Sequence, residues 1–253
     1  MGLTGSAMGR GAVDGGLELH RNPGERLAAL VGNPNVGKST VFNGLTGLHQ
    51  HTGNWPGKTV AGAQGRCASD RQPYLLVDLP GAYSLLARSA EEAVTRDFLC
   101  FQRPDAAVVV CDATGLERNL NLVLQVLETG TPTVVCVNLL DEARRRGVRV
   151  DLAELSRCLG VPVVGVVARK RRSLRQVPAA LDTLLEGRWQ GEPLRPRYVP
   201  AVEEAAAAVE AALAPRLAGR LDGRWLALRL LEGDRELLRS AADFLDWDPA
   251  ADG

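Results

Sequence analysis

The stretch LAALVGNPNVGKS, residues 27–39, decides the fold. From Gly32 to Ser39 it fits the pattern GxxxxGK(S/T), directly after an apolar run and at the start of a helical pattern, which is the context that this phosphate-binding loop requires. Glycines let the backbone wrap closely around phosphates, and the N-terminus of the following helix adds partial positive charge. The stretch therefore predicts a nucleotide phosphate site in which Lys38 reaches the β and γ oxygens.

Around this loop, short apolar strands alternate with helical patterns, which indicates an α/β fold with a mainly parallel, six-stranded sheet. The expected strands are Leu27–Val31, Val60–Cys67, Tyr74–Asp78, Ala106–Cys111, Val134–Asn138 and Val161–Val167. The expected helices are Lys38–Thr46, Ala90–Phe101, Leu116–Glu128, Leu152–Leu159 and Leu174–Glu186. The sequence thus predicts a P-loop nucleotide-binding domain.

A small all-α domain is expected after this sheet. Three prolines interrupt residues 188–200, where we expect a linker. Beyond it, Ala201–Leu213 is alanine-rich, Asp222 can cap a helix that runs through Leu231, and Asp234 can cap another. The expected organisation is a flexible tail over 1–25, a nucleotide domain over 26–188, a linker over 189–200 and a helical domain over 201–253.

The composition is that of a soluble globular protein. Its 253 residues are 45% hydrophobic and carry a formal net charge of +0, so no overall charge attracts the chain to nucleic acid. The five cysteines are scattered without a close pair, which favours a reducing, cytosolic compartment. Apolar runs such as 106–111 are far shorter than the roughly 20 residues that a membrane span needs.

Ser39, Asp78 and Gly81 complete the expected phosphate and metal site. The Ser39 hydroxyl is an oxygen ligand of the kind that Mg²⁺ prefers, and Asp78, at the end of a buried strand, would hold the ion through water. Gly81, three residues later, has an N–H that can meet the γ-phosphate. The order and distance of this DLPG segment after the phosphate loop predict a γ-phosphate sensor.

Guanine is the expected base. Asn138-Leu-Leu-Asp141 follows the fifth predicted strand, and the Asp141 carboxylate can accept from guanine N1–H and the 2-amino group, which adenine cannot offer. Leu139 replaces the lysine usual between them, which removes a stem that could stack over the base. The last base contact, usually a Ser-Ala pair, is Val167-Ala168 here. The Ala168 N–H could meet guanine O6, but Val167 has no hydroxyl to support its loop, so weakened nucleotide affinity is expected.

Longer strings resemble the N-terminal cytosolic region of the FeoB family of bacterial ferrous iron transporters. They are LVGNPNVGKSTVFNGLTG (Leu30–Gly47), GNWPGKTVAGAQG (Gly53–Gly65), DLPGAYSL (Asp78–Leu85), DATGLERNLNLVLQVLE (Asp112–Glu128) and NLLDEA (Asn138–Ala143). The resemblance implies GTP and GDP binding with Mg²⁺, GTP hydrolysis, and a place on the cytoplasmic side of the bacterial inner membrane. It also implies a membrane permease part that this chain lacks and a GDP-dissociation-inhibitor role for the helical segment. No nucleic-acid partner is expected, and an oligomer is left open.

The resemblance also adds a first switch around Trp55–Ala61, with Thr59 closing onto Mg²⁺, and K⁺ held by the Asn35 side chain and first-switch carbonyls. Lys58 stands where an apolar residue is expected. The implied catalytic residues are Asn35, Lys38, Thr59 and Gly81. The residues expected to line the nucleotide are Gly32, Asn33, Pro34, Asn35, Val36, Gly37, Lys38, Ser39, Thr40, Gly57, Lys58, Thr59, Val60, Ala61, Asp78, Leu79, Pro80, Gly81, Asn138, Leu139, Leu140, Asp141, Val167, Ala168 and Arg169.

Two alternatives stay open from the sequence. One is a ribosome or RNA assembly GTPase, which would be expected to carry a basic RNA-binding module. The other is an interaction module whose shape depends on GTP without hydrolysis, since Ala82 after DLPG offers no glutamine to orient water. Of the remaining residues, we expect His49 and His51 to be surface loop residues rather than iron ligands, Arg169–Arg172 to be a solvated loop, and Trp55 to pack for function rather than as core.

Overall fold

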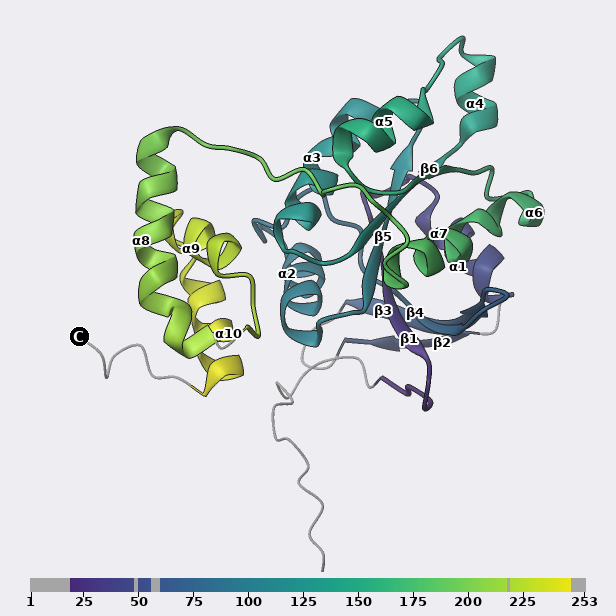
Figure 1. Cartoon of the computed structure of the whole chain (residues 1–253). Coiled ribbons are helices and arrows are strands. Elements are labelled where there is room, and N and C mark those ends of the chain that lie inside the picture. The colour runs from purple at the N-terminus through teal and green to yellow at the C-terminus, as the bar shows by residue number, and fades with distance from the viewer. Residues whose placement is uncertain (1–18, 48–49, 56–59, 218, 247–253) are drawn as a thin grey trace, which may run out of the picture.

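The computed structural model describes residues 19–47, 50–55, 60–217 and 219–246. It contains a seven-stranded sheet in the order β2-β3-β4-β1-β5-β6-β7 (Figure 1). Strands β1, β4, β5, β6 and β7 are parallel neighbours, whereas β3 pairs antiparallel with β2 and β4. The strands are β1 (Arg26–Gly32), β2 (Gln50–Asn54), β3 (Ala61–Ala68), β4 (Pro73–Asp78), β5 (Ala106–Asp112), β6 (Thr133–Asn138) and β7 (Val163–Gly165).

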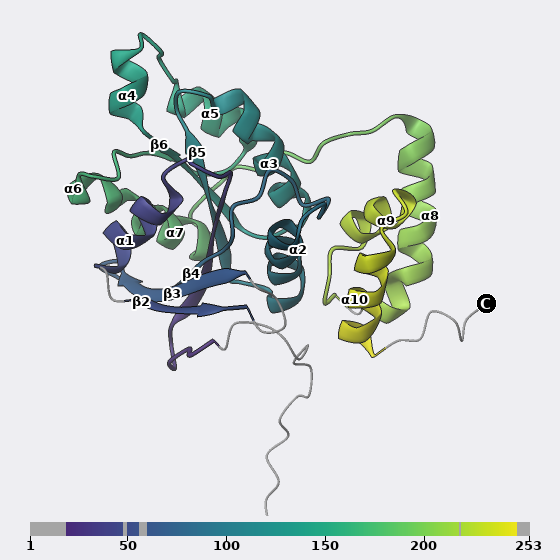
Figure 2. The same ribbon diagram turned by 180° about the vertical axis from the view of Figure 1, so that it is seen from behind.

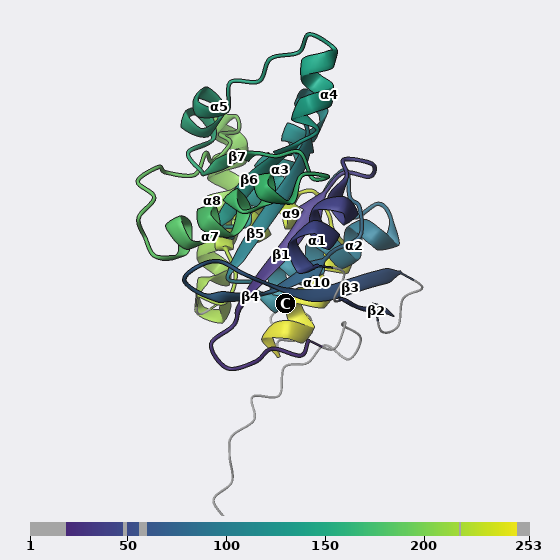
Figure 3. The ribbon, with the colours of Figure 1, turned by 90° about the vertical axis from the view of Figure 1, so that its right-hand side faces the viewer.

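Helices cover both faces of this sheet, and each face has its own apolar core. One core joins strand residues such as Leu27 and Val109 to α2, α3 and α5, and the other joins Leu30 and Val108 to α1 and α7. Figure 3, seen from the side of α1 and α7, shows these two helices in front of the sheet. The helices are α1 (Lys38–Thr46), α2 (Ala90–Asp97), the π-helix η1 (Phe98–Gln102), α3 (Leu116–Glu128), α4 (Leu140–Arg145), α5 (Leu152–Leu159), α6 (Arg171–Leu174) and α7 (Gln176–Leu185).

The predicted α/β P-loop fold with a following helical domain is confirmed, with differences in detail. The strand β2 adds a seventh, edge strand to the six expected. The helix expected over Ala90–Phe101 changes to a π-helix at Phe98, and α6 begins at Arg171, inside the segment expected to be a loop. The helix α4 was not expected.

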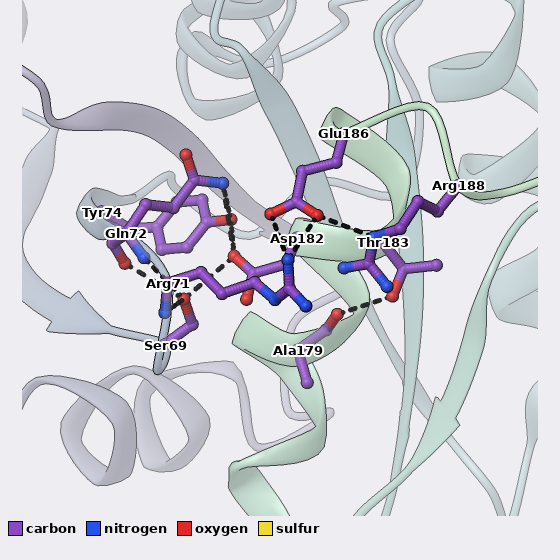
Figure 4. A network of polar contacts seen from close by, with 9 residues as sticks. All are labelled: Ser69, Arg71, Gln72, Tyr74, Ala179, Asp182, Thr183, Glu186 and Arg188. Atoms are coloured by element: carbon purple, nitrogen blue, oxygen red, sulfur yellow. Dashed lines mark hydrogen bonds and ion pairs between the residues drawn. The ribbon is translucent and has the colours of Figure 1, made fainter.

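Polar contacts tie α7 to the turn between β3 and β4 (Figure 4). The buried Asp182 of α7 accepts hydrogen bonds from Tyr74 at 2.7 Å, Ser69 at 2.9 Å and Gln72 at 3.3 Å. Burial, followed by the Asp182 carboxylate, raises the pKa of the Tyr74 hydroxyl above its ordinary value of 10.0. Tyr74 therefore stays protonated and can donate to Asp182, which fixes the strand pair against the helix that covers it.

Three helices form a separate group beside α2 (Figures 1 and 2). They are α8 (Pro200–Leu217), α9 (Gly223–Leu231) and α10 (Arg235–Leu245). Their apolar core includes Cys100 and Phe101 of η1, and Phe101 lies 5.2 Å from Phe244 of α10, measured between ring centroids. The buried Arg96 of α2 pairs with Asp234 at 2.8 Å, so polar and apolar contacts both join the two parts. No helix among the described residues is both long enough and apolar enough to cross a membrane.

The segment between α7 and α8 is extended and follows the nucleotide domain closely. The Trp189 indole N–H donates to Gly160 O at 2.9 Å, and Leu194 N donates to Leu159 O at the same distance. Gly160 has a φ of 67°, and a Cβ there would lie 1.6 Å from Glu192 O. Only glycine suits this close approach, which holds the segment against the end of α5.

Candidate nucleotide site

The phosphate loop turns between β1 and α1 with two residues in the left-handed region. Asn35 has a φ of 66° and Gly37 a φ of 81°, a conformation that glycine, and to a lesser degree asparagine, adopts at low cost. At the start of the loop, a Cβ on Gly32 would lie 2.7 Å from Val110 O of β5. The backbone thus forms the tight loop that GNPNVGKS predicts, at the carboxyl end of a parallel strand, where nucleotides bind in open α/β sheets.

Lys38, Ser39 and Asp78 lie together at this end of the sheet. The Lys38 ammonium donates to the Asp78 carboxylate and to Leu79 O, and both charged side chains are largely buried. Burial raises the pKa of the Asp78 carboxyl from its ordinary value, and the Lys38 charge and the Ser39 hydroxyl act in the opposite direction. A carboxylate beside a hydroxyl is a donor set that fits Mg²⁺. The third predicted ligand, Thr59, lies outside the described residues.

The DLPG segment is joined to the phosphate loop through the backbone. Leu79 N donates to Leu30 O, and Ala82 N donates to Gly32 O, both at 3.1 Å. A Cβ on Gly81 would lie 3.1 Å from Pro34 Cγ and 3.3 Å from Pro34 N. The missing side chain lets Gly81 approach the phosphate loop closely, which fits the predicted γ-phosphate sensor.

Asn138 connects the phosphate loop to the predicted base-binding loop. Its buried amide donates through Nδ2 to Val36 O at 3.1 Å and accepts through Oδ1 from Ala168 N at 3.1 Å. The expectation was that the Ala168 N–H would be directed at guanine O6. In this structure it instead donates to Asn138, because the loop after β7 packs directly on that side chain.

Asp141 lies in the first turn of α4, which projects beyond the carboxyl ends of the strands (Figure 1). Its side chain is partly exposed, and no partner for the carboxylate lies in the part of the chain that the structure describes. Leu139 just before it has a φ of 62°, which is unusual for a residue with a branched side chain. Strained backbone of this kind is concentrated at functional sites. Here it forms the turn from β6 into α4.

The remaining predicted residues fall into three groups. Gly57, Lys58 and Thr59 of the first switch lie outside the described residues, as do Pro56 and His49. Val60 is buried and accepts from Trp55 N at 2.7 Å, while Ala61 begins β3. The remaining phosphate-loop and flanking positions, Asn33, Thr40, Pro80, Leu140 and Arg169, lie on the loops and helix ends already described.

Trp55 differs from its expected role. Its side chain is only 4% exposed and belongs to the core, with its ring 5.6 Å from that of Phe98 in an edge-on arrangement. A Cβ on Gly62 would lie 2.4 Å from Trp55 Nε1, so the strand beside the ring requires glycine. His51 is exposed, as expected of a surface loop residue, while His49 lies outside the described residues.

Three residues near the site were missed in the sequence. The Glu92 carboxylate accepts from Tyr83 N and Ser84 N at 3.1 Å and from Arg88 N at 3.0 Å, which fixes the loop after DLPG. Thr95 donates its hydroxyl to Pro80 O at 3.1 Å. The spacing of Ser89 and Glu92, typical of a helix capping box, was a usable signal for Glu92. The third residue, Ser173, bonds to Val167, and no pattern in the sequence marks it.

The chain matches two family models. Ferrous iron transport protein B matches residues 26–181, and the FeoB cytosolic helical domain matches residues 198–248. The chain belongs to the FeoB family. It is therefore the G domain and cytosolic helical domain of a P-loop GTPase family, and the alternative of a ribosome or RNA assembly GTPase is set aside.

Curated relatives and solved structures agree with this family. The chain is 39% identical, over 88% of its length, to the Fe(2+) transport protein A/Fe(2+) transporter FeoB fusion protein of Porphyromonas gingivalis. It is also 39% identical, over 86% of its length, to the Fe(2+) transporter FeoB of Salmonella typhimurium. The chain spans 27% and 28% of these two relatives.

Among solved structures, the cytosolic domain of T. maritima FeoB in GDP form II has a TM-score of 0.79 and 32% identity, covering 87% of this chain and 86% of that one. The cytosolic domain of L. pneumophila FeoB has a TM-score of 0.72 and 32% identity, covering 87% of this chain and 94% of that one. At these identities, both FeoB structures share family as well as fold with this chain.

Proposed function

We propose that this chain is the nucleotide switch of a ferrous iron transporter, binding GTP and GDP with Mg²⁺ and hydrolysing GTP. The feature that carries the proposal is the Asn138 side chain, which bonds to Val36 of the phosphate loop and to Ala168 of the base loop. One amide thus holds both halves of a nucleotide site in register. FeoB structures described as GDP and GMPPNP forms support the same ligand class for this chain.

The phosphates would lie against the loop from Gly32 to Ser39. Lys38 would move its ammonium from the Asp78 carboxylate to the β and γ oxygens, because a phosphate offers it stronger charge-assisted hydrogen bonds. Ser39, Asp78 and Thr59 would hold Mg²⁺, which when bound neutralises phosphate charge. Gly81 would donate its N–H to the γ-phosphate, close to Pro34.

Hydrolysis breaks the bond between the γ-phosphorus and the oxygen that bridges to the β-phosphate, and water supplies the new oxygen of the released phosphate. Ala82 has no polar side chain and is buried, so it cannot orient that water. The chain's contribution is positioning and electrostatic stabilisation by Lys38 and backbone N–H groups. Asn35, exposed in its left-handed turn, would hold K⁺ beside the phosphates with the carbonyls of the first switch.

The helical group over α8–α10 would brace the nucleotide domain and slow GDP release. Its contacts with η1 and α2, through Phe101 and Arg96, support this role because α2 follows directly from the DLPG loop. The membrane part of the same transporter would be the partner, with this chain on the cytoplasmic side of the bacterial inner membrane. The domain limits at 26–188 and 201–253, with a linker between, belong to the same proposal.

The base assignment has a direct test in Asp141→Asn. Xanthine carries a 2-oxo group where guanine carries the 2-amino donor, so an amide at position 141 can donate to the 2-oxo group. We expect the variant to bind the xanthine nucleotide XDP more tightly than GDP, and wild type to show the opposite order, measured by calorimetric titration at fixed Mg²⁺. The control Asp151→Asn makes the same substitution at the aspartate that caps α5 of the same domain, and it should leave the GDP preference unchanged. A retained GDP preference in Asp141→Asn would remove this residue from the base site.

A further inference from the structure

The loop that follows β7 carries the predicted base contact, Ala168, but lacks a hydroxyl at the preceding residue, Val167. Residues 167–170 form a tight turn in which Lys170 N donates to Val167 O at 2.7 Å. The next N–H in the chain, that of Ala168, donates to Asn138 Oδ1. The direction of this N–H, and with it the geometry of the base site, depends on what holds the turn.

Ser173 holds the turn from its far end. Its hydroxyl accepts from Val167 N at 3.1 Å and lies 2.9 Å from Val167 O and 2.8 Å from Lys170 O, to either of which it can donate. A single side chain thus binds both backbone groups of Val167. These are the contacts that a hydroxyl within the turn would be expected to supply.

The position of Ser173 is itself fixed by the helix that follows the phosphate loop. Its neighbour Leu174 is 2% exposed and packs so closely on α1 that a Cβ on Gly44 would lie 2.3 Å from Leu174 Cδ1. The same Cβ would lie 3.5 Å from Ala168 O. Packing of Leu174 on α1 therefore fixes Ser173, and the hydrogen bonds of Ser173 fix the turn over residues 167–170. Together these contacts hold the base loop in place relative to the phosphate loop.

We propose that Ser173 is a positioning residue for the guanine base: its hydroxyl replaces the one that Val167 cannot supply and slows release of the bound guanine nucleotide. This inference rests on the proposed nucleotide-binding function. Without the hydroxyl, the Val167 N–H loses its side-chain acceptor and the turn loosens. The Ala168 N–H is then held less firmly on Asn138, and the base loop loses its register with the phosphate loop.

The test measures release of GDP labelled with a methylanthraniloyl group, by stopped-flow fluorescence after mixing with excess GDP. Loss of one net hydrogen bond corresponds to roughly a two- to tenfold change in an equilibrium constant, so we expect Ser173→Ala to release the labelled GDP faster by that factor. Ser156→Ala is the matched control, because its hydroxyl also bonds to a backbone carbonyl, Val161 O at 2.7 Å, on the surface of the same domain. It should release the nucleotide at the wild-type rate.

A second-site variant separates positioning from general loss of stability. Adding Val167→Ser to Ser173→Ala returns a hydroxyl to the turn and should restore the release rate to within about twofold of wild type. If Ser173→Ala acted only by lowering the stability of the domain, a hydroxyl at position 167 would not restore the rate. An unchanged rate in Ser173→Ala, or a double variant as fast as Ser173→Ala alone, would overturn the role of Ser173. Wild type that fails to bind the labelled GDP at all would instead overturn the proposed function on which the role rests.

Discussion

Replacing Gly37 by alanine adds one Cβ atom, which disturbs both the phosphate loop and the base loop. Gly37 has a φ of 81°, and its new Cβ would lie 2.5 Å from Asn138 Nδ2. The left-handed conformation costs an L-residue about 1–2 kcal/mol. The clash must also displace the buried Asn138 amide from Val36 O and Ala168 N, and each lost bond costs about 1 kcal/mol net. We expect Gly37→Ala to lower the free energy of unfolding by about 3 kcal/mol.

The matched control is Gly147→Ala, because Gly147 has a φ of 74° but no atom within 4 Å of its would-be Cβ. It carries the conformational cost alone, about 1–2 kcal/mol, and should bind GDP as wild type does. Urea unfolding without nucleotide measures the stabilities, and calorimetric titration measures GDP affinity, which we expect to fall about tenfold or more only in Gly37→Ala. Equal stability losses in the two variants, with GDP affinity retained in both, would refute the proposed role of Asn138.

Two further predictions concern ion pairs in which one of the two side chains is buried. Burial raises the pKa of Glu25, but hydrogen bonds from Asn22 and Arg66 outweigh burial and bring the pKa below its ordinary value of 4.5. The ionised carboxylate therefore stabilises the fold above pH 4.5, and this contribution is lost as the pH falls through the folded pKa. Glu25→Gln should therefore be less stable than wild type in urea unfolding near neutral pH, and equally stable in strong acid, below the folded pKa. A stability difference that persists in strong acid would contradict this role of the Glu25 carboxylate. Asp234→Asn keeps a helix cap but removes one of the two carboxylates that pair with the buried Arg96, the other being Asp97, and should cost about 2 kcal/mol in thermal unfolding. The control Asp222→Asn, a cap that faces an exposed arginine, should cost less, and equal losses would show that the Arg96 pair contributes nothing.

The elements that could be predicted from sequence are those whose local pattern and tertiary role agree. The apolar runs at 27–31, 106–111 and 134–138 form central strands buried on both faces, and the phosphate-loop pattern places α1 after the first of them. The positions of Lys38, Ser39, Asp78 and Asn138 at one edge of the sheet follow from parallel strand order alone. This part of the site needs no knowledge of distant contacts.

The parts that could not be predicted depend on such contacts. The edge strand β2 has the polar sequence QHTGN and forms through pairing with β3, which no local pattern indicates. The helix expected through Phe101 changes to a π-helix because its aromatic rings face two partners: Phe98 packs on Trp55 in the sheet core, and Phe101 packs on Phe244 of α10. The arginine cluster is exposed as expected, yet α6 forms because Leu174 is buried against Gly44.

The most direct test of GTP hydrolysis at this site is phosphate release from GTP at fixed Mg²⁺, measured in K⁺ and in Na⁺. We predict release by wild type that is faster in K⁺ than in Na⁺, loss of the K⁺ stimulation with retained GDP binding in Asn35→Ala, and release lowered by about a hundredfold or more in Lys38→Ala. Equal wild-type rates in the two salts would discard the K⁺ site, and stimulation that survives in Asn35→Ala would discard this residue as its ligand. No phosphate release by wild type in either salt, with GTP bound, would contradict the central claim and leave a nucleotide-dependent interaction module instead.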